Sequence, residues 1–251
     1  MTKILLSGCN GRMGRMITAI AEKDNEIEIA AGIDKFTGTE NSYPVFESID
    51  KCDIAADVIV DFSLPSGTDA LLEYASSKNI PLVLCTTGLT DEQIGRVKEA
   101  SEKVAILRSA NMSVGINLLM KLLAEAAPKL AEAGFDIEIV EKHHNQKKDA
   151  PSGTALALAD AVNSSLENSY SYVYDRSTRN EARHEKEIGI SAVRGGTIPG
   201  DHDVIFAGED EVITFSHRAY SRAVFAKGAI SAAKFLSGKE AGLYDMSDVL
   251  A

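Results

Sequence analysis

The sequence predicts an α/β protein with a Rossmann-type doubly wound parallel sheet and a second α/β domain that contains an open mixed sheet. Three observations support this fold class. Short apolar runs alternate with helical patterns over the first 110 residues, a glycine-rich loop follows the first apolar run, and the pattern changes after Asn111. Regular alternation of strand and helix is typical of βαβ units, whose parallel sheet is covered by helices on both faces.

Five strands are expected in the first part of the chain. Their spacing of about 25 residues leaves room for one crossover helix each time. Ser66 is expected to cap the helix after the third strand, and Thr90 to Gln93 form a capping box that begins the next helix. The five strands cover residues 3–7, 26–33, 57–62, 81–87 and 104–110.

A second domain is expected after Asn111, where a long apolar helix over 113–134 precedes an alternating strand over 135–140. Ser152 caps a further helix, and the polar stretch 169–186 is expected to be an exposed loop or a poorly ordered arm. Three strands follow over 187–196, 202–210 and 211–219, with a tight turn at 208–210. The last long helix, 221–238, is expected to return to the first sheet, because a doubly wound sheet needs helices on both faces. The predicted domains are residues 1–112 with 223–251, for dinucleotide binding, and residues 113–222, for substrate binding and oligomerisation.

Composition limits the partners and the compartment. The net charge of −11 disfavours nucleic acids and anionic membranes, so an anionic ligand needs a local cationic pocket. Apolar runs are far shorter than the roughly 20 residues that span a bilayer, and no secretory leader is visible. Cys9, Cys52 and Cys85 are widely spaced and fit free thiols in a reducing compartment. A cytoplasmic protein is therefore expected.

A glycine-rich loop connects the first strand to the first helix. Gly8, Gly11 and Gly14 allow a tight turn and a close approach of the backbone to a pyrophosphate at the helix N-terminus. Asp34 follows Gly14 by 20 residues, where a carboxylate accepts hydrogen bonds from a ribose, and the adjacent Lys35 would attract a 2′-phosphate. The loop predicts binding of NADH or NADPH, with a purely structural glycine turn as the alternative.

Two further strand ends are expected to border the nicotinamide. Ligands of open α/β sheets lie at the carboxyl ends of the strands. The fourth predicted strand ends at Cys85, Thr86 and Thr87, and residues 109–112 follow the fifth. Ordinary loop capping is the structural alternative for both segments.

The segment 141–155 carries the residues suited to catalysis. His143 and His144 exchange protons near neutral pH, and Lys147 supplies a mobile positive charge. Ser152 as N-cap would leave the amides of the next two residues able to bind a carboxylate. Together these groups predict an anionic substrate and a protonation step, against the alternative of a solvated surface turn. No metal is expected, because adjacent histidines on a strand point in opposite directions.

Motifs along nearly the whole chain resemble the 4-hydroxy-tetrahydrodipicolinate reductase family of lysine and diaminopimelate biosynthesis. They are GCNGRMG, EKHHNQKKDAPSGTA, DFSLPSGT, TTGL, SANMSVGIN, RGGTIPGDHDVIF and GLYDMSDVL. This resemblance implies NAD(P)H-dependent reduction of 4-hydroxy-tetrahydrodipicolinate to tetrahydrodipicolinate with loss of water. It also implies a small dicarboxylate substrate and a homotetramer.

The resemblance also implies roles for individual residues. His143 corresponds to a proton donor or acceptor, Lys147 to a second proton donor and His144 to a substrate-binding residue. Gly153 and Thr154 correspond to a carboxylate-binding pair. The implied nucleotide-binding residues are Gly8, Cys9, Asn10, Gly11, Arg12, Met13, Asp34, Lys35, Cys85, Thr86, Thr87, Ser109, Ala110, Asn111 and Met112.

Some residues depart from the family pattern or leave the interpretation open. Asn145 and Gln146 stand where some members carry basic residues, and Cys85 stands where some have glycine. Arg194 and Arg222 either add positive charge to the substrate pocket or form surface ion pairs. The alternative functions are another two-domain NAD(P)-dependent dehydrogenase and a non-catalytic dinucleotide-sensing module.

Overall fold

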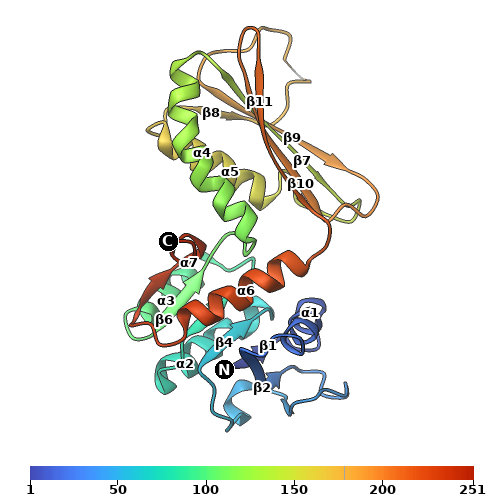
Figure 1. The fold of residues 1–251 in the computed structure, drawn as a ribbon, viewed down its shortest axis with the longest axis vertical. Coiled ribbons are helices and arrows are strands. Elements are labelled where there is room, and N and C mark those ends of the chain that lie inside the picture. The colour runs from blue at the N-terminus through green and yellow to red at the C-terminus, as the bar shows by residue number, and fades with distance from the viewer. Residues whose placement is uncertain (178) are drawn as a thin grey trace. The chain divides into compact units, whose positions relative to one another are not determined.

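The computed structural model describes residues 1–177 and 179–251, which form two compact units (Figure 1). Unit 1 comprises Met1–Val114 and Arg222–Ala251, and unit 2 comprises Gly115–Ser221. The unit boundaries lie within two residues of the predicted domain boundaries. The last long helix, α6 (Ala223–Leu236), belongs to unit 1.

Unit 1 is built on a seven-stranded sheet in which all strand pairs are parallel. The strand order is β12-β6-β5-β4-β1-β2-β3. The sequence order therefore reverses beside β1, as in doubly wound sheets that bind nucleotides. The strands are β1 (Thr2–Ser7), β2 (Ile27–Ile33), β3 (Val45–Phe46), β4 (Val58–Asp61), β5 (Leu82–Leu84), β6 (Ala105–Arg108) and β12 (Gly242–Tyr244).

Two edge strands of this sheet, β3 and β12, are absent from the five predicted strands. They have two and three residues, too few to show an alternating pattern. Each is a strand only because its backbone pairs with an existing edge, β3 with β2 and β12 with β6.

Helices cover both faces of the sheet in unit 1. Helix α1 (Arg12–Ala21) packs with α6 on one face, and α2 (Thr68–Lys78) packs with α3 (Asp91–Ser101) on the other. Thr90 and Gln93 form the predicted capping box. The predicted cap at Ser66 is wrong: α2 has Gly67 as its N-cap without a side-chain bond, because a 3₁₀ turn over Pro65–Gly67 leads into it. The shorter helices are η1 (Ile49–Lys51) and α7 (Met246–Val249).

Unit 2 contains the predicted mixed sheet, in the order β11-β10-β7-β9-β8. β7 is parallel to β9 and antiparallel to β10, and β10 and β11 form a hairpin. The strands are β7 (Asp136–His143), β8 (Ser171–Val173), β9 (Glu187–Arg194), β10 (Gly200–Ala207) and β11 (Val212–Ala219).

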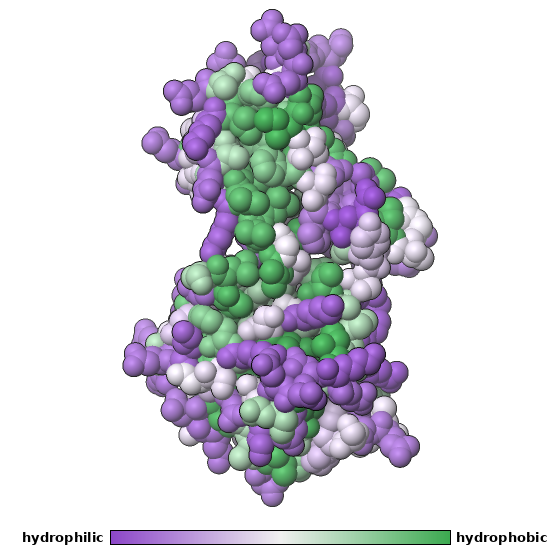
Figure 2. All heavy atoms as spheres, viewed as in Figure 1, coloured by the Kyte–Doolittle hydropathy of each residue, from purple (hydrophilic) through white to green (hydrophobic). Residues whose placement is uncertain are grey.

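Two helices cover one face of this sheet and leave the other open (Figure 1). They are α4 (Val114–Glu132) and α5 (Gly153–Ser165), and Ser152 caps α5 as predicted. On the open face, Val212 is exposed near the edge of the sheet. Figure 2 shows apolar side chains gathered along α4, where Leu118 and Leu122 are exposed. Exposed apolar surface of this kind is typical of a protein interface.

Most described residues of the stretch 169–186 are exposed, as expected for a loop, but the stretch also makes specific contacts with the sheet. It contains β8, and its arginines bind carboxylates of the sheet. Arg176 donates to Glu138 at 2.9 Å and to Glu187 at 2.7 Å, and Arg183 lies 3.2 Å from Glu138. These charges compensate one another, so the segment lies on the sheet. Residue 178 lies outside the described part.

Among the described residues, no helix is both long enough and apolar enough to cross a membrane.

Candidate active site

A pocket of about 600 Å³ opens at the carboxyl edge of the sheet in unit 1. Ser7 at the end of β1 is paired with Asp61 at the end of β4, and β2 lies on the other side of β1. The strand order reverses here, which is where open α/β sheets bind ligands. The predicted nucleotide-binding residues that line this pocket are Gly8, Asn10, Gly11, Asp34 and Lys35.

The glycine-rich loop has the geometry that a pyrophosphate requires. Gly8 has a φ of +77°, and a Cβ there would lie 2.7 Å from the carbonyl oxygen of Phe62. A Cβ at Gly14 would lie 2.3 Å from the carbonyl oxygen of Gly8, so helix α1 approaches the loop closely. Gly11 precedes α1 without a side-chain cap, and the first turn of α1 has no acidic residue. The positive end of this helix dipole therefore suits a bound anion.

Asp34 holds the two loops of the pocket together. Its Oδ2 accepts a hydrogen bond from the Asn10 amide and its Oδ1 accepts one from the Phe36 amide, each at 3.0 Å. Each carboxylate oxygen has a further lone pair for a ribose hydroxyl. Lys35 is exposed next to it.

Other predicted nucleotide-binding residues do not line this pocket. Cys9 is buried, and burial raises the pKa of its thiol to about 11, so only its backbone is available to a ligand. Met13 and Met112 pack against the core of unit 1, and Arg12 is exposed on α1. The remaining predicted residues follow β5 and β6 at the same sheet edge: Cys85, Thr86, Thr87, Ser109, Ala110 and Asn111. Among them, Thr86 donates a hydrogen bond to buried Asp61 at 2.5 Å.

Several pocket residues were not predicted. Some belong to the segment between β2 and β4, such as Phe36, Thr39 and Ser48. Those on α1 and in the loop between β4 and α2 are Arg15, Phe62, Ser63, Leu64, Ser66 and Gly67. The motif DFSLPSGT contains the residues from the loop after β4. Its position directly after a predicted strand is the signal that could have identified them, since ligands bind at that end of a strand.

The second set of candidate residues lies where β7 and β9 end in unit 2. His143 and Arg194 are paired across these parallel strands. Glu141 is completely buried, and one of its oxygens lies 2.6 Å from Nδ1 of His143. Arg194 donates to both oxygens of Glu141 at 2.7 Å. The Ser152 amide, at the start of α5, donates to the same carboxylate at 2.9 Å.

Burial and hydrogen bonding act in opposite directions on this cluster. Burial alone would raise the pKa of Glu141, but the bonds from Arg194, His143 and Ser152 outweigh it and lower the pKa. Burial lowers the pKa of His143, and Glu141 offsets part of this effect. The carboxylate is therefore ionised at neutral pH, and the imidazole is mostly neutral in the absence of an anionic ligand.

The guanidinium of Arg194 is held by the protein itself. Besides Glu141, it donates to the Asp149 carbonyl oxygen at 2.6 Å. Of the two roles expected for Arg194, the structure shows an ion pair, formed with a buried carboxylate rather than at the surface. Arg222 belongs to unit 1, where it precedes α6.

Lys147 and the start of α5 make the cationic part of the site. Nζ of Lys147 lies 2.9 Å from Asp149 Oδ2, and this hydrogen bond lowers the pKa of Asp149. Gly153 is exposed and Thr154 half-buried, so the beginning of α5 is accessible. His144 is half-buried, and its amide donates to the Ile198 carbonyl at 2.8 Å.

His202 is part of this cluster and was not predicted. It comes from β10, and its ring centroid lies 5.2 Å from that of His143, edge to face. Its Nε2 lies 3.1 Å from Oγ of Ser152. Burial lowers the pKa of His202 to about 4, and it stays neutral. The motif RGGTIPGDHDVIF contains it, but only the pairing of β10 with β7 brings it beside His143.

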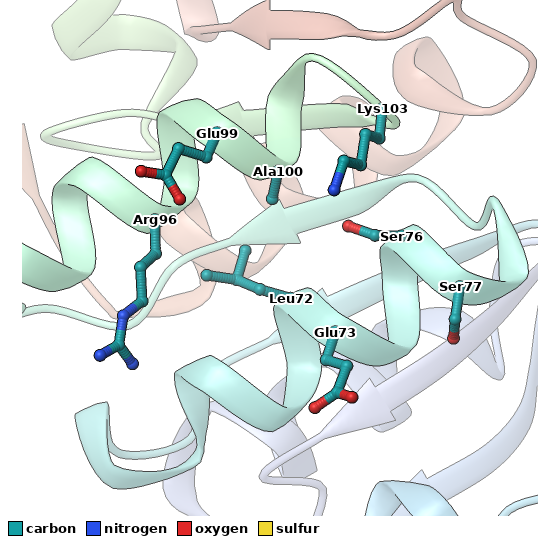
Figure 3. Close-up of a pocket in the computed structure, with 8 residues that line it drawn as sticks. All are labelled: Leu72, Glu73, Ser76, Ser77, Arg96, Glu99, Ala100 and Lys103. Carbon is teal, nitrogen blue, oxygen red and sulfur yellow. The ribbon is translucent and has the colours of Figure 1, made fainter.

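A second, shallow pocket of about 410 Å³ lies between α2 and α3 in unit 1. Figure 3 shows Glu73 and Ser76 from α2 and Glu99 from α3 around it. None of the predicted site residues lines it. Among the described residues, no group of three His, Cys, Asp or Glu side chains is placed to hold a metal ion.

The parallel sheet with a pocket at its carboxyl edge, followed in the chain by an α/β unit with a buried histidine–carboxylate pair, fits the class of two-domain oxidoreductases. Family models described as dihydrodipicolinate reductase, N-terminus, and dihydrodipicolinate reductase, C-terminus, match residues 2–112 and 115–250. The chain belongs to the dihydrodipicolinate reductase family.

Relatives and a solved structure agree with this assignment over the full length. The chain is 52% identical to a 4-hydroxy-tetrahydrodipicolinate reductase of Caldanaerobacter subterraneus subsp. tengcongensis, covering 100% of this chain and 98% of the relative. It is 49% identical to that of Clostridium tetani, covering 100% and 97%. The dipicolinate-bound dihydrodipicolinate reductase of Paenisporosarcina sp. TG-14 has a TM-score of 0.79 and 26% identity, covering 98% of this chain and 97% of that chain.

The low pKa of His202 predicts a pH-dependent stability. Between pH 4 and pH 6.5 the unfolded chain binds a proton at His202 that the folded chain does not bind, so stability falls as the pH falls through this window. The full shift in the pKa of His202 corresponds to about 3 kcal/mol in the free energy of unfolding. We expect His202→Gln to reduce the slope of the free energy of unfolding against pH, measured by urea titration.

The exposed His184 provides the matched control, because His184→Gln removes a histidine without removing a buried one. That variant should keep the wild-type slope. An unchanged slope in His202→Gln would contradict the low pKa of His202 in the folded protein.

Proposed function

We propose that the chain reduces 4-hydroxy-tetrahydrodipicolinate with NADH or NADPH in lysine biosynthesis, and that the residues around His143 handle the proton. The reaction consumes the substrate, NAD(P)H and one proton, and yields tetrahydrodipicolinate, NAD(P)⁺ and water. The observation that carries this proposal is the grouping of His143, Lys147 and the accessible start of α5 at the end of β7. These groups match an anionic substrate that must be protonated.

The nucleotide-binding part of the proposal rests on unit 1. It is supported by the tight turn of the loop Gly8–Gly14 at the start of α1 and by Asp34, which lines the same pocket. When bound, the cofactor supplies a hydride. Asp34 favours a free 2′-hydroxyl, whereas Lys35 would attract a 2′-phosphate, so use of both cofactors is expected.

The substrate-binding part rests on unit 2. Lys147 and the amides of Gly153 and Thr154 are proposed to bind one substrate carboxylate, with the dipole of α5 favouring the negative charge. An arriving carboxylate would compete with Asp149 for Lys147, which is 2.9 Å from it. His144 is proposed as a further substrate-binding residue.

His143 is proposed to transfer a proton, with Lys147 as a second donor. Its neutral form predominates in the free protein because burial lowers its pKa. A dianionic ligand nearby would raise that pKa and favour the protonated form. Substrate binding would therefore help to prepare the acid that the reaction needs.

A homotetramer and a cytoplasmic location complete the proposal. The sheet of unit 2 has an open face, and Leu118, Leu122, Val193 and Val212 are exposed in this unit. Contact between copies of the chain would remove such surfaces from water. Cys9, Cys52 and Cys85 are free thiols, as is typical of proteins in a reducing compartment.

Activity tests the proposal directly. Pyruvate, aspartate semialdehyde and a coupling enzyme would generate the substrate, and oxidation of NADH or NADPH would be followed by absorbance. We expect His143→Ala to lower kcat by roughly 100- to 10,000-fold, the usual contribution of a general acid, with nucleotide affinity unchanged. Lys147→Ala should raise the substrate KM and lower kcat. A wild-type kcat in His143→Ala would reject its role, and no turnover by the wild type would reject the function.

The role of Lys35 is tested by comparing the two cofactors. Removing its positive charge should raise the KM for NADPH and leave the KM for NADH nearly unchanged, because only NADPH carries the 2′-phosphate. We expect Lys35→Ala to raise the KM for NADPH by about tenfold, which corresponds to the weakening of one charged contact. Lys103→Ala, in the pocket between α2 and α3, is the control. Equal changes for both cofactors would contradict this role.

Sedimentation velocity tests the tetramer. A mass of about four times the 26.9 kDa of one chain is expected. Val212→Lys places a charge on the open sheet face and should shift the population to smaller species, whereas Leu243→Lys, on an exposed strand of unit 1, should not. A monomeric wild type would contradict the proposal.

A further inference from the structure

Glu141 is a buried charge to which the proposed function assigns no role. It lies on β7 two residues before His143, and none of its surface is exposed to solvent. A carboxylate in such a place is strongly destabilising unless it is fully hydrogen-bonded. Its partners therefore indicate what it does.

Those partners come from three elements. Arg194 on β9 binds both oxygens at 2.7 Å, and the Ser152 amide at the start of α5 binds Oε1 at 2.9 Å. The remaining partner is Nδ1 of His143, 2.6 Å from Oε2. The arginine and the amide can only donate, so they keep the carboxylate ionised and acceptor-only.

An ionised carboxylate at 2.6 Å determines which ring nitrogen of His143 carries the proton. Since Oε2 can only accept, Nδ1 must donate, and the proton that a neutral imidazole possesses is therefore on Nδ1. Nε2 is then the nitrogen that gains and loses a proton. Arg194 in turn fixes the orientation of the carboxylate by its two-pronged contact.

We infer that Glu141, held by Arg194, is a positioning residue that fixes the Nδ1–H tautomer and the orientation of His143, so that Nε2 is the atom that exchanges the proton with substrate. The kinetic part of this inference rests on the proposed function, whereas the tautomer does not.

Gly200 supports the assignment of Nε2. A Cβ built at this residue, the first of β10, would lie 3.1 Å from Nε2 of His143. The absence of a side chain at this position leaves space next to the one nitrogen that Glu141 does not engage. The other groups around the His143 ring are the neutral His202 and the cationic Lys147 and Arg194.

A purely structural role is the competing explanation, since the Glu141 carboxylate also joins β7, β9 and α5. The two roles differ in what they predict. A structural role predicts lower stability with the His143 tautomer unchanged. A positioning role predicts a changed tautomer and a loss of kcat with little change in KM.

The test uses the full-length protein and the variant Glu141→Gln, which preserves the shape of the side chain. The control is Glu138→Gln on the same strand, where the carboxylate binds Arg176 and Arg183 instead of a histidine. Nitrogen-15 NMR of labelled histidines reports the tautomer of each ring. The signals of His143 are identified by their loss in His143→Gln.

We expect Nδ1–H in the wild type and in Glu138→Gln, and a change to Nε2–H in Glu141→Gln, because an amide NH₂ facing Nδ1 makes that nitrogen an acceptor. In Glu141→Gln, kcat should fall at least about 100-fold, by analogy with other histidines that lose their orienting carboxylate. The KM values should stay within about threefold. Glu141 also raises the pKa of His143. As the pH rises, the kcat/KM of Glu141→Gln should therefore decline at a lower pH than that of the wild type, because His143 loses its proton earlier.

Finding Nε2–H in the wild type would overturn the inference, even if Glu141→Gln does not fold. A folded Glu141→Gln with wild-type kcat, or one that loses stability while its tautomer is unchanged, would also overturn it. An inactive wild type with the Nδ1–H tautomer would reject the proposed function and leave the tautomer assignment supported.

Discussion

The buried carboxylate of Glu141 is the constraint on which unit 2 depends most. Removing one partner of a buried ion pair costs about 3 to 5 kcal/mol, because the other charge stays buried without compensation. The hydrogen bonds of the Glu141 carboxylate form only when β7, β9 and Ser152, the residue before α5, are in place together. A one-residue slip of β7 would move Glu141 and His143 to the open face of the sheet. The hydrogen bonds of this carboxylate therefore specify the register of the strand that carries the histidine.

Strand β7 places two carboxylates, those of Glu141 and Glu138, in different environments on its two faces. One face of β7 is directed to the helices and carries Ile137, Ile139, Glu141 and His143. Ile137 and Ile139 belong to the hydrophobic core that the sheet forms with α4 and α5. Glu138 points to the other face, where the arginines of the segment after β8 bind it. The alternation of a strand thus separates a carboxylate that holds a histidine from one that holds a loop.

The two units obtain their sites from the same property of parallel strands, whose carboxyl ends lie at one edge. In unit 1 that edge brings the glycine-rich loop beside Asp34 and the loop after β4. In unit 2 it brings His143 beside Arg194. The antiparallel β10 adds its beginning at the same edge, which is how Gly200 and His202 reach the His143 ring.

The sequence by itself determined what depends on neighbouring residues: the strand periodicity, the caps at Thr90 and Ser152, the glycine-rich loop and the family motifs that identify the reductase. Only the tertiary structure decided what depends on distant pairing. That includes the edge strands β3 and β12, the ion pairs of Arg176 and Arg183 with the sheet, and the Glu141–Arg194 pair, whose members are 53 residues apart. Local patterns encode dihedral preference and burial, whereas the partner of a charged side chain is set by which strands become neighbours.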